Sequence, residues 1–448
     1  MIIISIPAHC LPERTFIVDI VFKEFLGLDY QIQESNKADY AIVLENKKQL
    51  IIRDHFFSRF EDNTTYLHIR NIPEQVMRAR NQFAVEADVP VIFGDAELAV
   101  TEDKIVCGAD VFASSFFMLT RWEEYVHQAR DIHNRFPAAE SLAFKHDFLD
   151  RPVVNEYVEM LWNMLVALGC RQQKKEREFK IVLTHDVDEV RFWKNWKDAS
   201  SKIKNRFMQT KDVRAAWSLF REYVSVRNGT TKDPFDTFDM LMDMSESHQV
   251  RSHFYLMSAT AGQHDHCDSI ASVTMQELMN KIKQRGHIIG FHPSYNSYNK
   301  SELWQEEKEF FERTFGEVVK EGRQHYLRFE VPITWQLWDD NNMERDLTLG
   351  FPEREGFRCG TCFEYSAFNI LTRKKLRVKE SPLIAMESSF IDYQKTSVEK
   401  MDEKIRDLIK TTKLYNGNFV VLWHNSSLTI PPRNAYKRVY ENILCQKN

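Results

Sequence analysis

Short apolar runs alternate with amphipathic helical patterns along the second half of the chain. Seven runs have the length and composition of buried strands: 181–183, 253–257, 288–291, 326–329, 347–349, 383–386 and 419–423. Segments such as 235–247, 275–285 and 302–315 repeat apolar residues at helical spacing and separate many of these runs. Alternating strands and helices predict a parallel sheet. Periodicity alone leaves open whether this sheet closes into a barrel or forms an open doubly wound sheet.

The first half of the chain shows the same kind of alternation, and a polar segment separates it from the second half. The predicted strands are 2–6, 40–44, 50–52, 66–69 and 90–93, and the predicted helices are 16–25 and 111–126. Residues 171–178 are all polar and mostly charged, which is typical of a solvated linker. A chain of 448 residues has room for two or three domains. We therefore expect an N-terminal α/β accessory domain over residues 1–170 and a second domain over residues 179–448.

Charge, hydropathy and cysteine content bear on the binding partners and the compartment of the protein. The net charge is −5, so the chain has no broad basic field and nucleic acid is not favoured as a partner. No stretch approaches the ~18 apolar residues of a membrane span. The seven cysteines are scattered without a disulfide framework, and the first residues lack the basic region and cleavage site of a signal peptide. These features predict a cytoplasmic protein.

Polar side chains follow two of the predicted strands at the points where the strands end. Asp186 and Asp188 come just after the run 181–183, and His292 follows the run 288–291. If the strands are parallel neighbours, these groups converge at one rim of the sheet, where barrel enzymes place their chemistry. Carboxylate and imidazole ligands there suit a divalent metal that activates water. The alternative is that both aspartates cap a turn or the following helix.

Four segments of the second half resemble, in order, the motifs of the polysaccharide deacetylases, the NodB-homology or carbohydrate esterase type 4 family. They are LTHDVD at 183–188, GHIIGFHPSYN at 286–296, LRFEVP at 327–332 and VVLWHNS at 420–426. The resemblance implies a deformed (β/α)7 barrel for the C-terminal domain. Parts of the first half resemble the amino-terminal domain that accompanies a bacterial subgroup of this family, which assigns no chemistry.

The resemblance also implies roles for individual residues. Asp186 would be the catalytic base, and Asp188, His292 and Asn296 would stand at the metal-ligand positions. Arg328 would orient the base, because a guanidinium grips carboxylates. His424 would protonate the departing amine. The implied cofactor is a divalent metal, with Zn²⁺ as the first choice.

The chain departs from the family pattern at three positions. Asn296 stands where the family has a second ligand histidine, Pro293 replaces a Ser or Thr, and Asn425 replaces an aspartate. An asparagine oxygen is a poorer ligand than imidazole for zinc. His264 and His266 are possible substitutes, although an exposed polar loop is the simpler interpretation of that segment.

Two classes of function follow from these observations. The first is a hydrolase that removes N-acetyl or O-acetyl groups from a carbohydrate, with a precursor of surface polysaccharide as substrate. The alternative is a carbohydrate-binding or scaffold protein on a catalytically lapsed deacetylase fold, which the three departures favour. A hydrolase of a non-sugar amide is a third possibility.

Three further features are candidates for secondary sites. Cys359 and Cys362 form a single CxxC, for which a structural loop is the favoured interpretation. Arg358 beside it is a candidate substrate contact. Trp335 and Trp338 could stack on a sugar ring or pack in the core.

Overall fold

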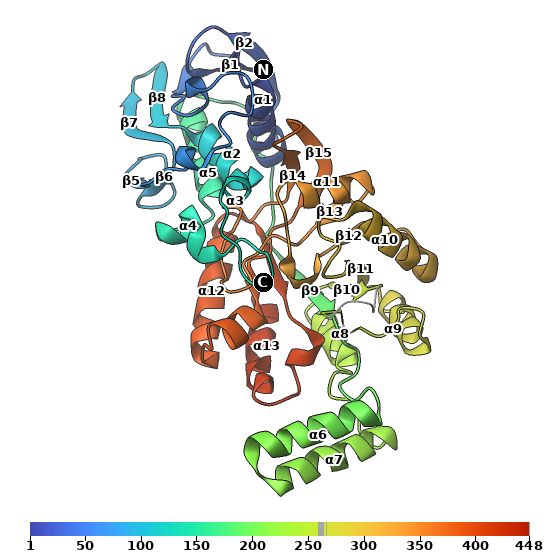
Figure 1. Ribbon diagram of the computed structural model, residues 1–448. Helices are drawn as coiled ribbons and strands as arrows, with labels where there is room; N and C mark the ends of the chain where they lie inside the picture. The colour runs from blue at the N-terminus through green and yellow to red at the C-terminus, as the bar shows by residue number, and fades with distance from the viewer. Residues whose placement is uncertain (259–263, 266, 448) are drawn as a thin grey trace.

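The computed structural model describes residues 1–258, 264, 265 and 267–447, and it contains two main β-sheets, one in each half of the chain (Figure 1). The N-terminal half lies at one end of the molecule in Figure 1, and the C-terminal sheet with its helices occupies the middle. No helix among the described residues is long and apolar enough to cross a membrane.

The N-terminal half is a six-stranded mixed sheet in the order β2-β1-β3-β4-β8-β7, with a separate two-stranded sheet of β5 and β6. The strands are β1 Ile2–Pro7, β2 Tyr30–Ser35, β3 Tyr40–Val43, β4 Gln49–Ile52, β5 Met77–Ala79, β6 Val89–Val91, β7 Gly94–Val100 and β8 Lys104–Ala109. The helices are α1 Leu11–Asp19, α2 Val111–Thr120, α3 Trp122–Val126, α4 Leu142–Lys145 and α5 Val153–Ala167. The predicted strand at 66–69 is wrong, because this segment forms a turn leading into a short 3-10 helix, Ile69–Asn71.

The C-terminal half contains a nine-stranded sheet in the order β14-β15-β13-β12-β11-β10-β9-β17-β16, parallel throughout except for β14. The strands are β9 Lys180–Val187, β10 Ser252–Met257, β11 Ile288–His292, β12 Glu321–Gly322, β13 Arg345–Asp346, β14 Tyr365–Asn369, β15 Lys374–Glu380, β16 Ala385–Met386 and β17 Asn418–Leu422. The helices are α6 Trp196–Thr210, α7 Val213–Arg227, α8 Phe238–Ser247, α9 Val273–Gln284, α10 Ser301–Phe315, α11 Ile333–Asp340, α12 Val398–Leu414 and α13 Lys437–Cys445.

The chain between β15 and β16 closes this sheet into a barrel. β15 pairs with β13, and in the chain just after β15 the Leu383 N–H donates to the Leu349 carbonyl at 3.1 Å. The end of this segment turns to the opposite edge, where Ile384 N–H donates to the Val420 carbonyl at 3.0 Å and β16 pairs with β17. One segment therefore bridges the two edges as a seventh stave. This confirms the α/β class and the deformed seven-stave barrel with a smaller N-terminal α/β portion.

One predicted barrel strand is misplaced. The fourth stave is β12, not the run 326–329, because Tyr326 and Leu327 adopt left-handed backbone angles with φ of 62° and 54°. The strand forms at Gly322 because this residue approaches β11 so closely that an added Cβ would stand 1.9 Å from the Phe291 carbonyl oxygen. Only glycine permits that approach.

The two halves share a continuous apolar core. Phe16 of α1 packs on Phe368 of β14 with ring centroids 4.6 Å apart, and Phe25 packs on Phe363 at 5.2 Å. Buried ion pairs cross the same boundary, including Arg358 to Glu124 at 2.6 Å. The polar segment 171–178 is also held to the N-terminal half, since Lys175 N–H donates to the Leu26 carbonyl at 2.7 Å. The division into units at 1–170 and 179–448 therefore stays a prediction.

Candidate active site and metal centre

Three potential metal ligands meet where the parallel strands end. Asp188 directly follows β9, His292 ends β11, and His325 lies in the turn after β12. His292 Nε2 lies 3.3 Å from Asp188 Oδ1, and His325 Nε2 lies 3.6 Å from the same oxygen. One ligand atom from each residue fits within 4.8 Å of the others. The expected proximity of Asp188 and His292 thus exists in the fold, with a second histidine beside them.

The chemistry of this cluster fits a divalent ion. His292 Nε2 and Asp188 Oδ1 are buried atoms with no hydrogen-bond partner among the described residues. Buried polar atoms are normally satisfied, so such a pair calls for an explanation. Ligand atoms bound tetrahedrally at ~2.0–2.2 Å from one ion stand roughly 3.4 Å apart, close to the distances seen here. Two imidazoles and one carboxylate also match the ligand sets of catalytic zinc sites and of non-haem iron sites.

Neighbouring groups fix how the two imidazoles face the cluster. His325 Nδ1 donates to Asp265 Oδ1 at 2.9 Å, and Asp265 also accepts the Tyr295 N–H at 2.9 Å. His292 Nδ1 donates to the Arg323 carbonyl at 2.5 Å. With each Nδ1 used as a donor, each Nε2 is left free to face an ion, the arrangement that orients ligand histidines in metalloproteins.

Electrostatics in the cluster favour an ionised Asp188. Burial would raise the pKa of this carboxyl, but His292, His325 and His424 surround it and lower the pKa below its usual value. Burial would lower the pKa of His292, and the facing carboxylates of Asp186 and Asp188 instead raise it. The site is therefore a compact set of mutually dependent charges.

The structure does not bring Asn296, the residue expected at the third ligand position, into the cluster. Asn296 is exposed in the turn after β11 and is absent from the pocket lining, whereas His325 presents the missing imidazole. The proposed substitute His264 is not in the cluster either, because its ring packs on Tyr295 with centroids 4.2 Å apart. His266 lies outside the described residues.

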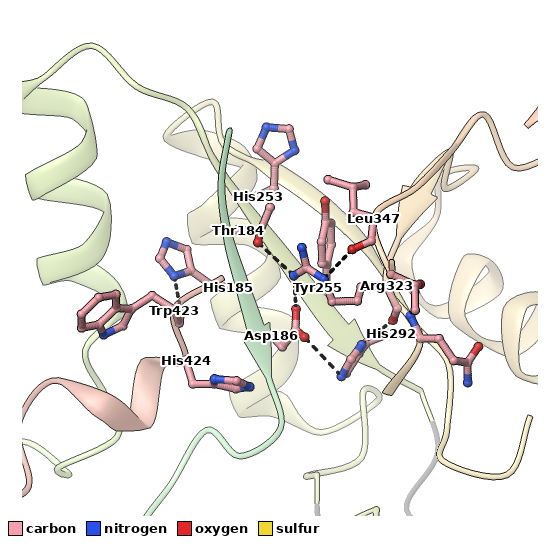
Figure 2. Close-up of polar contacts among 12 residues, drawn as sticks. Thr184, His185, Asp186, His253, Tyr255, His292, Arg323, Leu347, Trp423 and His424 are labelled. Atoms are coloured by element: carbon pink, nitrogen blue, oxygen red, sulfur yellow. Dashed lines mark hydrogen bonds and ion pairs between the residues drawn. The ribbon is translucent and has the colours of Figure 1, made fainter. Parts of the chain in front are cut away.

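Asp186 lies between His292 and a buried arginine, Arg323 (Figure 2). Arg323 Nη1 donates to Asp186 Oδ1 at 2.8 Å and to Thr184 Oγ1 at 2.9 Å, while its Nε donates to the Leu347 carbonyl at 2.8 Å. The other carboxylate oxygen, Oδ2, points toward His292 Nε2 at 3.9 Å. One oxygen of Asp186 is thus fixed by Arg323, and the other faces His292 and the cluster.

The expectation that Arg328 orients the base is wrong, because Arg328 does not contact Asp186 and Arg323 does. Arg328 donates to the carbonyls of His133 and Tyr295, and its guanidinium lies 4.0 Å from the ring centroids of Tyr295 and Tyr298. Arg323, at the end of β12, makes the contact that was assigned to Arg328. Arg328 instead links His133 of the N-terminal half to the turn after β11.

His424 lies across the site from His292 and His325. Its Nε2 stands 3.7 Å from Asp188 Oδ2, and its Nδ1 donates to Glu387 Oε1 at 2.7 Å. Burial would lower the pKa of His424, but Glu387, Asp188 and Asp186 outweigh it and raise the pKa to about 10. His424 therefore holds a proton at neutral pH in this constellation, as a general acid requires.

A pocket of about 400 Å³ opens over these groups. Asp186, Asp188, His292, His325 and His424 line its floor. Its wall includes Arg135 from the N-terminal half, whose Nη1 donates to the Tyr326 carbonyl at 2.9 Å and whose Nη2 donates to Tyr393 Oη at 3.1 Å. A segment of the N-terminal half thus contributes to the wall of the barrel site.

The secondary candidates serve the core. Trp335 and Trp338 are fully buried, so neither offers a face to a sugar. Arg358 is buried and paired with Glu124. Cys359 and Cys362 are buried, and burial raises the pKa of the Cys359 thiol to about 12, which makes it unreactive.

Sequence reasoning missed Arg323, His325, Asp265 and Glu387. Arg323 and His325 immediately follow Gly322, and the short apolar run just beyond drew the strand assignment away from them. The glycine before a polar triplet was the available signal. Asp265 and Glu387 had no such signal, because their roles depend on partners distant in the sequence.

Comparison with known proteins adds limited information. A model of a family of unknown function, DUF7033, matches residues 2–169. A search of curated proteins found no match. That family model covers the N-terminal half alone and carries no activity.

Several solved structures align with part of this chain. A Mycobacterium smegmatis protein named as a polysaccharide deacetylase aligns with 60% of this chain and 85% of its own, at 14% identity and a TM-score of 0.38. The PuuE allantoinase aligns with 60% of this chain and 84% of its own, at 11% identity and a TM-score of 0.36. A CE4-family pseudoenzyme from Bacillus anthracis aligns with 59% of this chain and 62% of its own, at 10% identity and a TM-score of 0.29. These values are too low to support an argument about activity, which must come from the residues of this chain.

Proposed function

We propose that this protein is a metal-dependent hydrolase that removes an acetyl group from the nitrogen, or the oxygen, of a carbohydrate. The observation that carries the proposal is the meeting, in one pocket, of a two-histidine, one-aspartate cluster with a carboxylate bonded to Arg323 and a histidine bonded to Glu387. Asp188, His292 and His325 would hold the ion, with Zn²⁺ as the first choice. When bound, the metal would supply an activated water and polarise the acyl carbonyl.

The remaining chemistry would come from two groups of this chain. Asp186 would accept the proton of the attacking water through Oδ2, since Arg323 occupies Oδ1. His424 would donate its proton to the departing nitrogen, and Glu387 would keep the imidazole turned toward the pocket. Separate base and acid residues on two sides of one pocket suit amide hydrolysis, which needs both transfers.

The lapsed, carbohydrate-binding alternative was motivated chiefly by Asn296. His325 offers the imidazole that Asn296 lacks, so that motivation weakens. Asn425 is buried, and its Nδ2 donates to the Glu189 and Phe235 carbonyls at 2.9 and 3.0 Å. It therefore has a structural task that does not depend on catalysis. A role in surface polysaccharide synthesis and a cytoplasmic location remain part of the proposal.

The direct test is release of acetate from N-acetylglucosamine oligosaccharides by the purified protein. We expect about one equivalent of bound divalent metal and acetate release that stops on chelation and returns on adding Zn²⁺. Metal content is measured by elemental analysis and acetate by a coupled assay. Bound metal without turnover on any acetylated sugar would favour another acyl substrate, and absence of both would favour the binding protein.

A second expectation concerns the proposed acid. His424→Ala should lower turnover by ~10²–10⁴-fold, mostly in kcat, because protonation of the leaving nitrogen matters only as the C–N bond breaks. Metal content should stay at the wild-type level, since His424 is not in the ligand cluster. His248→Ala, at a partly buried histidine outside the pocket lining, serves as the matched control. An unchanged kcat in His424→Ala would remove this residue from the mechanism.

A further inference from the structure

Two antiparallel helices, α6 and α7, project from the body of the molecule (Figure 1). This hairpin is inserted between β9 and α8, and it begins shortly after Asp188. Only Ala199 in α6 and Tyr223 in α7 are buried. Most of the surface of both helices is therefore free of contact with the rest of the described chain.

The hairpin exposes large apolar side chains, which soluble proteins usually bury. The exposed fractions are 56% for Trp196, 40% for Phe207, 56% for Met208, 68% for Val213 and 59% for Trp217. Phe207, Met208 and Val213 flank the turn at the tip of the hairpin, where α6 ends and α7 begins. Apolar groups gathered on one projecting element mark a binding surface.

The charge of the hairpin is opposite to that of the rest of the molecule. Residues 194–227 contain nine basic and three acidic side chains, whereas the whole chain has a net charge of −5. Four of the basic residues, Lys204, Arg206, Lys211 and Arg214, surround the apolar tip, and none of them forms an ion pair with another described residue. The tip thus combines unpaired positive charge with exposed apolar groups.

We propose that the α6–α7 hairpin docks on a lipid bilayer that contains anionic lipids. Tryptophan, phenylalanine and aliphatic side chains enter the headgroup boundary, and lysine and arginine contact anionic headgroups. A second hairpin would be repelled by like charge. A nucleic acid would use the basic groups but gives no partner to the aliphatic tip residues Met208 and Val213.

This docking would also place the pocket near the bilayer. The hairpin follows the metal ligand Asp188 on the rim where the strands end, so a membrane that touches α6 and α7 lies on the side of the molecule that carries the site. The binding surface itself does not depend on the proposed hydrolysis, because it is defined by the hairpin residues alone.

The test is co-sedimentation of the full chain with vesicles of phosphatidylcholine, with or without about one third phosphatidylglycerol. We expect binding to the mixed vesicles that is lost at high salt, and little binding to phosphatidylcholine alone. Replacing Lys204, Arg206, Lys211 and Arg214 by Gln should weaken partitioning by at least ~100-fold, since each basic residue near an anionic surface contributes roughly five-fold. Met208→Ser with Val213→Ser should weaken it by ~10-fold or more.

Matched controls change the same residue types elsewhere on the surface. Lys37, Lys104, Lys400 and Lys410 are exposed, and their replacement by Gln should leave vesicle binding unchanged. Val273 and Val318, exposed by 74% and 67%, serve as the apolar controls for Met208 and Val213. Circular dichroism checks that each variant stays folded.

Four outcomes would overturn the proposal. They are no binding to either vesicle, equal binding to both at high salt, equal losses in hairpin and control variants, and tighter binding to an oligonucleotide than to the mixed vesicles. Self-association that Met208→Ser with Val213→Ser abolishes, measured by analytical ultracentrifugation without lipid, would instead assign the hairpin to an interface between copies. None of these results depends on turnover, so failure of this proposal is distinguishable from failure of the proposed hydrolase.

Discussion

Asp186→Asn is expected to lower hydrolysis by ~10²–10⁴-fold, the usual contribution of a positioned general base. The amide keeps an oxygen that can accept the bond from Arg323, so the side chain stays in place. It cannot accept the proton of the attacking water. Steady-state kinetics on an N-acetylated oligosaccharide measure the effect, which should fall in kcat.

The control for this variant is the same substitution two residues further along the chain, at Asp188. Asp188→Asn should lose both metal and activity, because Asp188 Oδ1 is the atom nearest both histidine ligands. Asp186→Asn should retain metal at the wild-type level. Equal loss of metal in the two variants would identify Asp186 as a ligand and leave the base unassigned.

The sequence predicted four of the barrel strands well because each is a clear apolar run, whereas it missed β15, whose buried and exposed residues alternate. β9, β10, β11 and β17 bury nearly all their residues and carry the pattern along their whole length. β12 and β13 are two residues long, too short for any periodicity. The role expected of Arg328 came from the resemblance of the segment 327–332 to the family motif, whereas the arginine that contacts Asp186 follows β12.

The site was predictable where one motif contains both a strand end and its functional residue. Asp186, Asp188, His292 and His424 each follow the apolar run that positions them, and they converge as expected. The partners that orient them come from other elements. Glu387 meets His424 from the chain after β16, and Asp265 meets His325 from the loop after β10. Such contacts depend on tertiary structure, which local sequence does not encode.

Arg135 is the clearest example of information outside the motifs. It lies in the N-terminal half, which the sequence assigned no chemistry, yet it lines the pocket of the barrel. Its guanidinium is held by Asp131 at 2.7 Å and bonds to Tyr326 and Tyr393 on the rim. Packing of the N-terminal half on the barrel, which no single segment indicates, therefore completes one wall of the site.

His325→Ala is expected to weaken metal binding by more than the roughly 10–100-fold that loss of an outer partner costs, because it removes a ligand itself. Activity should fall with metal occupancy and recover in part at high metal concentration. Competition with a chromophoric chelator measures the affinity. Asn296→Ala is the matched control and should leave the affinity unchanged, since Asn296 is exposed and absent from the pocket lining.

A rescue experiment separates the two candidate ligand positions. Asn296→His in the His325→Ala background should not restore tight binding, because the imidazole would start from an exposed turn rather than from the buried position beside Asp188. The buried setting matters, since Asp265 holds the native imidazole with Nε2 toward the cluster. Restored affinity in the double variant, or full affinity in His325→Ala alone, would contradict this prediction. Either result would assign the third ligand position to residue 296, in the turn after β11, and would make His325 a structural residue.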